Sequence, residues 1–260
     1  MLTIDKLCYY SRLRYVNAME KFTYTVLTLV FCVASRSLLM AVLVLAVNGI
    51  LTVKKGGIPF SQYWHYLMIP LAFLIISTLA VIVNISHTPL NAFAFPVGSY
   101  YLTGSYASLH RGVQMILTAL SSVSCLYFLS FNTPMTDILS VLKKLHCPDL
   151  LAELMLLIYR YIFLLLEISS AISISQDSRL GNRNFRTSLK SFGAMASVLL
   201  IRAMAKSGAL YDSMEARCYD GRLKVLDEQY PPKPREIIWI ILFESLLLIY
   251  TVIKTLILTG

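Results

Sequence analysis

The sequence has few charged residues and lacks the motifs of common ATP-binding and catalytic sites. Only 14% of its 260 residues are charged, against roughly 25% in soluble globular domains. None of its eleven glycines is followed by Lys-Ser or Lys-Thr, so the chain has no phosphate-binding loop of the usual type. It also has no H-E-x-x-H zinc motif and no G-x-S-x-G nucleophile motif. Energy for any ATP-driven process must therefore come from a partner.

The sequence has no closely spaced pair of cysteines, and it shows no pattern typical of a cleavable leader. The five cysteines occur singly and in odd number, which favours reduced, packed thiols over a disulfide framework. The first twenty or so residues carry scattered charges and no short apolar core with a cleavage site, so we expect no removable signal peptide. The first spanning helix would then serve as the insertion signal.

Long apolar runs are what the sequence has in abundance, since 57% of its residues are hydrophobic. About twenty apolar residues are needed to cross a bilayer as a helix. The run from Phe22 to Val53 is interrupted only by the residues ASRS at 34–37, which predicts a tight hairpin of two spans. Three further spans are expected at 64–83, 108–129 and 237–258. The sequence therefore predicts an all-α integral membrane protein with about five transmembrane helices.

The basic residues predict the orientation of these spans, because Lys and Arg beside a span are retained in the cytoplasm. Basic residues precede the first span and follow the second, whereas residues 84–109 contain neither Lys nor Arg. Fourteen of the 23 basic residues lie between Lys143 and Arg235. We therefore expect the N-terminus and the region between the fourth and fifth spans to be cytoplasmic, and we read the net charge of +9 as membrane topology rather than nucleic-acid binding.

The region between the fourth and fifth spans is predicted to be helical rather than a linker. Thr133, Pro134 and Asp137 form a helix start signal. A second helix of roughly thirty residues, about 45 Å long, should begin near Pro148, because no glycine follows until Gly181. A third should run from Ser188 to about 215 and is rich in small residues, which allow helices to approach closely.

Both long helices are expected to end in an exposed segment with an arginine between small residues. Arg179 and Arg217 are 38 residues apart, in the sequences SRLG and EARCYDG. The guanidinium group is always charged and presents a planar set of donors suited to carboxylates, so each end could fit an acidic cleft of a partner. A simpler reading is that each arginine only complements the helix dipole at a common type of helix ending.

The strings that carry these arginines resemble a known family. Residues 131–181, and residues 202–223 with the sequence RAMAKSGALYDSMEARCYDGRL, are similar to the transmembrane T component of energy-coupling factor transporters, most closely the cobalt-type CbiQ family. The resemblance implies a membrane domain with a cytoplasmic coupling domain. It also implies two Ala-Arg-Gly-type motifs that dock into grooves on a pair of ATPase subunits.

Carried over by position, the two docking motifs fall on six residues of this chain. The resemblance assigns the first to Ser178, Arg179 and Gly181, and the second to Ala216, Arg217 and Cys218. Serine replaces the usual alanine in the first, and cysteine replaces the usual glycine in the second. Both replacements are small, so we expect docking to survive. Cys218 is the less comfortable change if its position needs a positive φ.

The expected organisation is residues 1–132 as N-terminal membrane helices, 133–235 as coupling helices and 236–260 as the last span. The resemblance implies a non-catalytic subunit without cofactor or metal site, in a bacterial inner membrane. Its implied partners are two ATPase subunits, a substrate-binding membrane subunit and a small accessory membrane subunit. Cobalt is the expected cargo, with nickel or a vitamin as alternatives. Glu244 and Arg111 are the candidate functional charges within spans, and they are too few to indicate an ion pathway.

A membrane enzyme related to phospholipid-forming phosphotransferases is the alternative from another functional class. Its site would use a set of acidic and basic residues near the two helix ends: Asp177, Arg183, Asp212, Glu215, Asp220 and Arg222. The spacing of these acids does not place several carboxylates on one helical face, as a metal-dependent site would need. The sequence therefore favours the coupling subunit.

Overall fold

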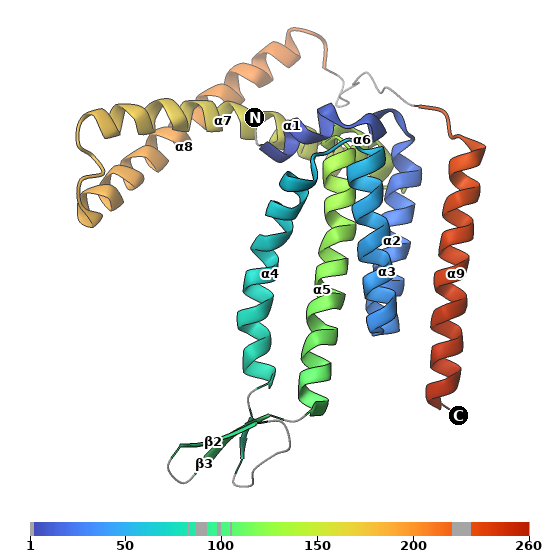
Figure 1. Cartoon of the computed structure of the whole chain (residues 1–260). Helices are drawn as coiled ribbons and strands as arrows, with labels where there is room; N and C mark the ends of the chain where they lie inside the picture. Colours follow the sequence, from blue (N-terminus) through green and yellow to red (C-terminus); the bar gives the residue numbers. More distant parts are fainter. Residues whose placement is uncertain are drawn as a thin grey trace. The chain divides into compact units, whose positions relative to one another are not determined.

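The computed structural model describes residues 3–82, 84–86, 93–97, 100–104, 106–219 and 230–259. These residues form two compact units, one with helices α6 to α8 and one with the remaining elements (Figure 1). The larger unit contains, in chain order, α1 Thr3–Tyr10, η1 Arg12–Tyr15, α2 Ala18–Ser35, α3 Leu38–Ile50, η2 Leu51–Lys55, α4 Phe60–Ile82, α5 Tyr106–Asn132 and α9 Pro234–Thr259. The smaller unit contains α6 Met135–Lys144, α7 Asp149–Ser178 and α8 Phe185–Glu215.

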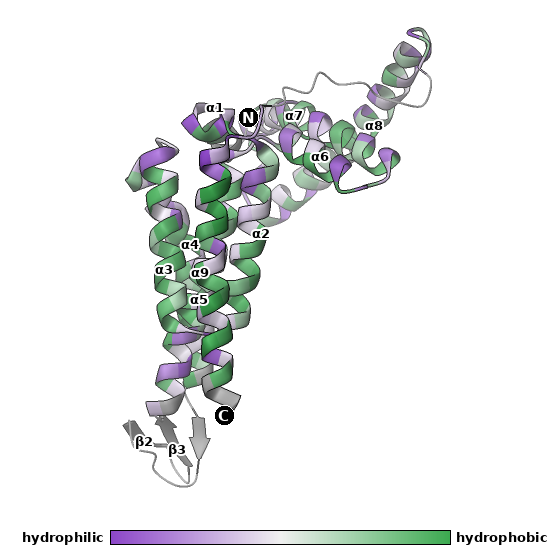
Figure 2. Ribbon diagram, turned by 90° about the vertical axis from the view of Figure 1, so that its right-hand side faces the viewer, coloured by the Kyte–Doolittle hydropathy of each residue, from purple (hydrophilic) through white to green (hydrophobic). Residues whose placement is uncertain are grey.

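The protein is an integral membrane protein built mainly from helices, as the sequence predicts. Six helical segments of the described residues are long and apolar enough to cross a bilayer: 18–35, 38–55, 60–80, 108–132, 185–215 and 234–256. Five of them coincide with the predicted spans. The sixth, in α8, was predicted as a coupling helix, and its length and composition alone do not distinguish the two. Figure 2 shows that α2, α3, α5 and α9 are hydrophobic over most of their length.

The predicted hairpin between the first two spans is confirmed. Asn17 caps the start of α2, because its side chain accepts a hydrogen bond from the backbone N–H of Met19 at 2.9 Å. Arg36 ends α2 in a left-handed conformation with φ of 42°. The Lys254 ammonium group, from α9, donates to the carbonyls of Ser35 and Arg36 at 2.5 and 2.8 Å. These bonds satisfy carbonyls that a helix end leaves open.

Polar side chains join the membrane helices inside the larger unit. The Tyr24 hydroxyl donates to Asn48 Oδ1 at 2.9 Å, and Asn48 Nδ2 lies 3.1 Å from Cys125 Sγ. These three residues belong to α2, α3 and α5. Hydrogen bonds between helices provide specific contacts where the surrounding lipid is as apolar as the side chains. Apolar clusters around Val44 and Phe131 complete the packing.

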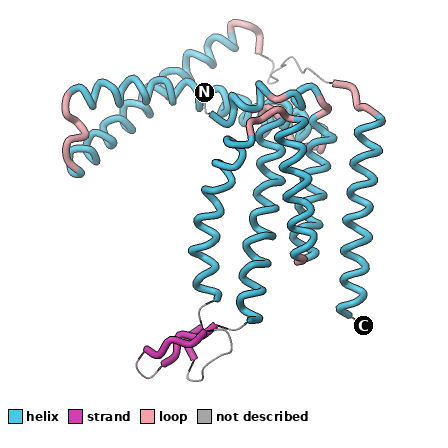
Figure 3. The backbone as a smooth tube through the Cα atoms, viewed as in Figure 1, coloured by secondary structure: helices cyan, strands magenta, loops and turns pink. Residues whose placement is uncertain are grey.

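A small sheet between α4 and α5 was not part of the all-α prediction. Its strands are β1 Asn84–Ser86, β2 Phe93–Val97 and β3 Tyr100–Gly104, with β3 in the centre and antiparallel to both neighbours (Figure 3). The paired positions include Ile85 with Leu102 and Phe95 with Leu102. The sheet lies in the segment that lacks basic residues, at the ends of two spans.

Candidate functional site: two arginine-bearing helix ends

Helices α7 and α8 form an antiparallel hairpin, which sets where the two arginines lie. Three hydrogen bonds define the pairing: Tyr161 Oη to the Lys206 carbonyl at 3.2 Å, Ser169 Oγ to Met195 Sδ at 3.5 Å, and Gln176 Nε2 to the Ser191 carbonyl at 2.8 Å. The residue numbers rise on α7 as they fall on α8, so the helices run in opposite directions, as the ribbons in Figure 1 also show.

The first arginine lies where α7 ends at the turn of this hairpin. Ser178 is the last helical residue, and its hydroxyl donates to the Ile174 carbonyl at 2.9 Å. Beyond it, the Leu180 N–H donates to the Asp177 carbonyl at 3.0 Å, and the Gly181 N–H donates to the Gln176 carbonyl at 2.8 Å. The second bond spans five residues and closes the helix in the manner of a Schellman motif.

The second arginine lies at a helix end of the same construction. The Cys218 N–H donates to the Glu215 carbonyl at 2.9 Å, and the Tyr219 N–H donates to the Met214 carbonyl at 3.1 Å. Each donor and each acceptor stands 38 residues after its counterpart in the first end. Arg217 corresponds in this way to Arg179, and Ala216 to Ser178. The backbone therefore presents the two arginines in the same local frame.

This register differs from the sequence assignment at one position. Leu180 and Cys218 hold the left-handed conformation, with φ of 58° and 56°. Leu180 is therefore the counterpart of Cys218, whereas the sequence had assigned Gly181 to that place. The concern that Cys218 occupies a position of positive φ is confirmed. Both motifs thus carry a side chain where glycine would be unstrained.

Gly181 has a different role, in the close approach of the turn to α8. A Cβ atom at this residue would lie 2.9 Å from the Gln176 carbonyl oxygen and 2.9 Å from Ser191 Oγ. The Ser191 hydroxyl donates to the Gly181 carbonyl at 2.9 Å. The absence of a side chain at Gly181 therefore lets α8 fold back against the end of α7 and fixes the first arginine at the hairpin turn.

Both arginines are exposed and lie far apart. Among the described residues, neither guanidinium group makes an ion pair or a hydrogen bond, so each is available to a partner. Arg179 precedes the 31-residue helix α8 and Arg217 follows it. At 1.5 Å per residue, α8 separates the two ends by about 45 Å. One cleft cannot hold both arginines at this separation.

The second end is also tied to the beginning of α7. The Tyr219 hydroxyl donates to Glu153 Oε2 at 3.0 Å, and Glu153 is buried. Hydrogen bonds to charged groups are among the stronger ones, so this contact anchors the segment after α8. Sequence reasoning missed it, because Glu153 and Tyr219 are 66 residues apart and nothing in the sequence shows that the start of α7 contacts the end of α8.

The residues of the alternative enzyme do not form one site in the described part of the chain. Asp177 lies at the hairpin turn, where its carboxylate accepts a hydrogen bond from the Asn182 amide. Asp212 and Glu215 lie at the other end of α8. Asp220 and Arg222 lie outside the described residues. No group of three His, Cys, Asp or Glu side chains with metal-binding geometry occurs among the residues that the structure describes.

The intramembrane carboxyl group of Glu244 has a structural partner. It is 7% exposed, and its Oε1 lies 2.6 Å from the Thr28 hydroxyl of the neighbouring helix α2. This contact joins α2 and α9 within the bundle. Arg111, the other charge singled out in a span, lies on an exposed part of α5. Glu244 therefore contributes to packing between helices rather than to a cluster of charges.

Comparison with known proteins connects this arrangement to cobalt transport. The family model CbiQ, described as cobalt transport protein, matches residues 11–227. An uncharacterized protein of Methanocaldococcus jannaschii is 32% identical over 95% of this chain and 91% of its own length. A putative fused cobalt transport protein CbiMQ of Methanocorpusculum labreanum is 28% identical over 94% of this chain and 41% of its own length. Cobalt transport protein CbiQ of Salmonella typhimurium is 25% identical over 85% of this chain and 98% of its own length.

Proposed function

Since the chain belongs to the CbiQ family of cobalt transport proteins, we propose that it is the membrane-embedded energy-coupling subunit of an ATP-driven importer of the energy-coupling factor type. In this role it hydrolyses no ATP itself. Two partner ATPase subunits bind the ends at Arg179 and Arg217, and their closure on ATP moves α7 and α8. This movement is passed to a separate membrane subunit that binds the cargo, with cobalt ions as the cargo.

The observation that carries this proposal is the repetition of one helix end at two distant positions. Both ends expose an arginine that has no ion pair or side-chain hydrogen bond within the described part of the chain, and both are closed by the same pair of backbone hydrogen bonds. The length of α8, about 45 Å, suits two separate clefts on two subunits. An arginine that only complements a helix dipole would not require the same hydrogen-bond pattern at both helix ends. It would also not require a residue with strained backbone after each arginine.

The proposal places both ends in the cytoplasm, where ATP is available. It takes the orientation from the distribution of basic residues, most of which lie beside α2, after α3 or between α5 and α9. The fused relative, whose printed name joins CbiM and CbiQ, supports a second membrane subunit as a direct partner. We place the complex, with a small accessory membrane subunit, in the bacterial cell membrane.

The test replaces the two arginines by alanine in the complete transporter. Arg179→Ala with Arg217→Ala should abolish both copurification of the ATPase subunits and cobalt uptake, because truncating a desolvated arginine at an interface costs about 2 to 5 kcal/mol of binding free energy. Each single substitution should leave one docking end and weaken binding less. Copurification and uptake of radioactive cobalt are measured in the same cells.

Two exposed arginines within α8 provide the matched control. Arg186→Ala with Arg202→Ala removes the same charge from the hairpin of α7 and α8 but leaves Arg179 and Arg217 in place. This control should bind the ATPase subunits normally. Normal binding and uptake by the Arg179 and Arg217 double variant would refute the docking assignment. Uptake of nickel in place of cobalt would retain the coupling role and correct the cargo.

A further inference from the structure

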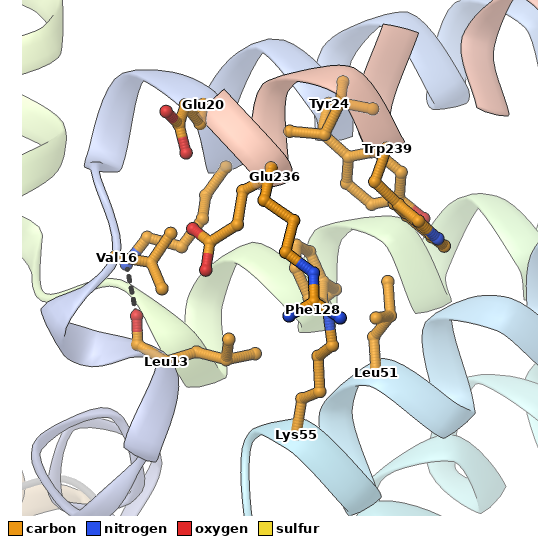
Figure 4. Close-up of a pocket in the computed structure, with 12 residues that line it drawn as sticks. Leu13, Val16, Glu20, Tyr24, Leu51, Lys55, Phe128, Glu236 and Trp239 are labelled. Carbon is orange, nitrogen blue, oxygen red and sulfur yellow. Dashed lines mark hydrogen bonds between the residues drawn. The ribbon is translucent and has the colours of Figure 1, made fainter. Parts of the chain in front are cut away.

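A cavity of about 460 Å³ opens in the larger unit where α2 and α9 begin and η2 ends. Figure 4 shows its lining. The apolar part is formed by Leu13, Val16, Tyr24, Leu51, Phe128, Trp239 and Ile240, and the charged part by Glu20, Lys21, Lys55, Arg235 and Glu236. Nothing in the coupling function uses this cavity, although it is lined by both charges and aromatic rings.

Three carboxylate oxygens of the cavity lack a well-placed donor among the described residues, although the Lys233 backbone N–H lies near Glu20. Both carboxylate oxygens of Glu20 and Oε2 of Glu236 are shielded from solvent and accept no hydrogen bond in the described structure. Figure 4 shows these two carboxylates on the same side of the cavity. A shielded carboxylate oxygen without a donor is unfavourable by several kcal/mol in an apolar setting. This side of the cavity is therefore suited to a group that brings several N–H donors.

The cationic side chains of the cavity differ in their availability. The Lys21 ammonium group is occupied, because it donates to the carbonyls of Leu13 and Asn132 at 3.1 and 2.9 Å. Lys55 and Arg235 are exposed at the rim, and the Lys55 ammonium lies 5.6 Å from the centre of the Trp239 ring. These two can bind an anionic group. The cavity thus offers two cations and two carboxylates to a ligand.

The position of the cavity indicates a lipid. Trp239 follows the first turn of α9, and Lys55 ends the segment after α3, as is typical of residues at the boundary between headgroups and acyl chains. With the orientation proposed above, this boundary belongs to the inner leaflet. Basic pockets between transmembrane helices on this side bind phospholipid headgroups. Ile240, which lines the cavity, also lines a second, apolar groove along α2 and α9 together with Leu27 and Leu248, and this groove provides a surface for an acyl chain.

We propose that this cavity binds phosphatidylethanolamine. Its phosphate pairs with Lys55 and Arg235, and its primary ammonium donates to Glu20 and Glu236. A primary ammonium group supplies three N–H donors, whereas the trimethylated ammonium of phosphatidylcholine supplies none. Phosphatidylglycerol has the phosphate but no cation for the carboxylates. Selectivity for the ethanolamine headgroup is therefore the property that distinguishes this site from an unspecific basic surface.

The test measures which lipid the purified full-length chain retains. The chain is placed in mixed bicelles of dioleoyl phosphatidylethanolamine, phosphatidylcholine and phosphatidylglycerol, and bound lipid is identified by native mass spectrometry. We expect phosphatidylethanolamine to be retained about tenfold more strongly than either competitor, because two charge-assisted contacts depend on its ammonium group. Glu20→Gln with Glu236→Gln should remove this selectivity, and Lys55→Gln with Arg235→Gln should weaken retention of all three lipids.

Lys54→Gln is the matched control, since Lys54 is an exposed neighbour of Lys55 that does not line the cavity. It should retain phosphatidylethanolamine normally. Equal retention of the three lipids, or unchanged selectivity in the glutamine variant of both carboxylates, would overturn the proposal. So would displacement of the lipid by millimolar glycerophosphoethanolamine, since the ligand would then be a soluble headgroup. Lipid retention needs no ATPase subunit, so its outcome is independent of the docking experiment.

Discussion

Leu180 and Cys218 each follow an arginine and hold a left-handed backbone conformation without being glycine. This conformation is unfavourable by roughly 1 to 2 kcal/mol for an L-residue with a Cβ atom. Both side chains are exposed, Leu180 by 66%, so packing does not offset the strain. The hydrogen bonds that close each helix end maintain it. Strain of this kind is often found where a structure holds a functional group in place.

Glycine at these two positions should stabilise the chain. Leu180→Gly and Cys218→Gly each relieve the left-handed strain, and the greater freedom of glycine in the unfolded chain offsets part of the gain. We expect a net increase of about 0.5 to 1 kcal/mol in the free energy of unfolding for each. Thermal unfolding of the purified protein measures this change in stability. Leu189→Gly, in the interior of α8, is the control.

The control should be destabilised by about 0.5 to 1 kcal/mol, because Leu189 is exposed and helical and glycine is a poor helix former. A loss of stability in Leu180→Gly equal to that of the control would contradict the assigned strain. The same variants should still bind the ATPase subunits, since both arginines remain.

At the scale of single residues, the sequence predicted that Arg179 and Arg217 lie at helix ends. It did not predict the left-handed conformation of Leu180. Arg179 and Arg217 stood out because the chain has few charges and both precede predicted helix ends. Leu180 was missed because Gly181, the next residue, is the usual choice for a left-handed position. Only the backbone hydrogen bonds show that Gly181 instead permits the close approach of Ser191.

Asn48 connects three helices of the membrane bundle. It is fully buried, accepts a hydrogen bond from Tyr24 on α2 and donates one toward Cys125 on α5. Within a bilayer, a single hydrogen bond between helices stabilises by about 0.6 kcal/mol on average and up to about 1.7. Through these two contacts and the volume of its side chain, Asn48 holds α3 against α2 and α5.

Replacement of Asn48 by alanine should therefore loosen the bundle. We expect a loss of about 1 to 2 kcal/mol in the free energy of unfolding, because both contacts disappear and the Tyr24 hydroxyl is left without its acceptor. Unfolding of the detergent-solubilised protein by heat or denaturant measures the change. In the control Ser245→Ala, the lost hydroxyl donates to the Leu242 carbonyl of its own helix α9. Equal effects of both changes would exclude a special role for Asn48.

The helices were more predictable than the contacts between them. Long apolar runs and helix start signals predicted the bounds of α7 and α8 to within about three residues. The residues ASRS predicted the turn of the first hairpin. The small sheet was missed because strands of three to five residues are too short to show an alternating pattern. The contacts from Asn48 to Tyr24 and Cys125 could not be predicted, since hydropathy does not show which helix faces meet.

At the scale of the whole molecule, α8 is a long helix that the described residues leave largely uncovered. None of its 31 residues is buried, and Leu200, Ile201 and Met204 are exposed by 64, 68 and 70%. Large exposed apolar surfaces usually mark contacts with a protein or a membrane. Sequence could not resolve this point, because a helix covered by a partner and a spanning helix have the same hydropathy. In the proposed transporter, the membrane subunit that binds the cargo covers α8.

The small residues of α8 allow this contact to be tested without disturbing the fold. Gly193 and Gly208 are 15 residues apart, which places them about 60° apart around the helix. Apart from neighbouring backbone of α8 itself, no atom of the described residues lies within 4 Å of a Cβ atom built at either position. Gly193→Leu with Gly208→Leu should therefore fold normally and still bind the ATPase subunits. It should lose the cargo-binding subunit and uptake, because bulky side chains prevent close helix packing.

Alanine at the same two positions is the control, since it adds only the Cβ atom and favours the helix by about 0.5 to 1 kcal/mol for each residue. It should retain uptake and unfold at a higher temperature. If the leucine variant transported cobalt at the normal rate, the contact with the membrane subunit would not lie on this face of α8. Loss of ATPase binding in the leucine variant would instead mean that the change had reached the helix ends, and the intact Tyr219–Glu153 anchor argues against that result.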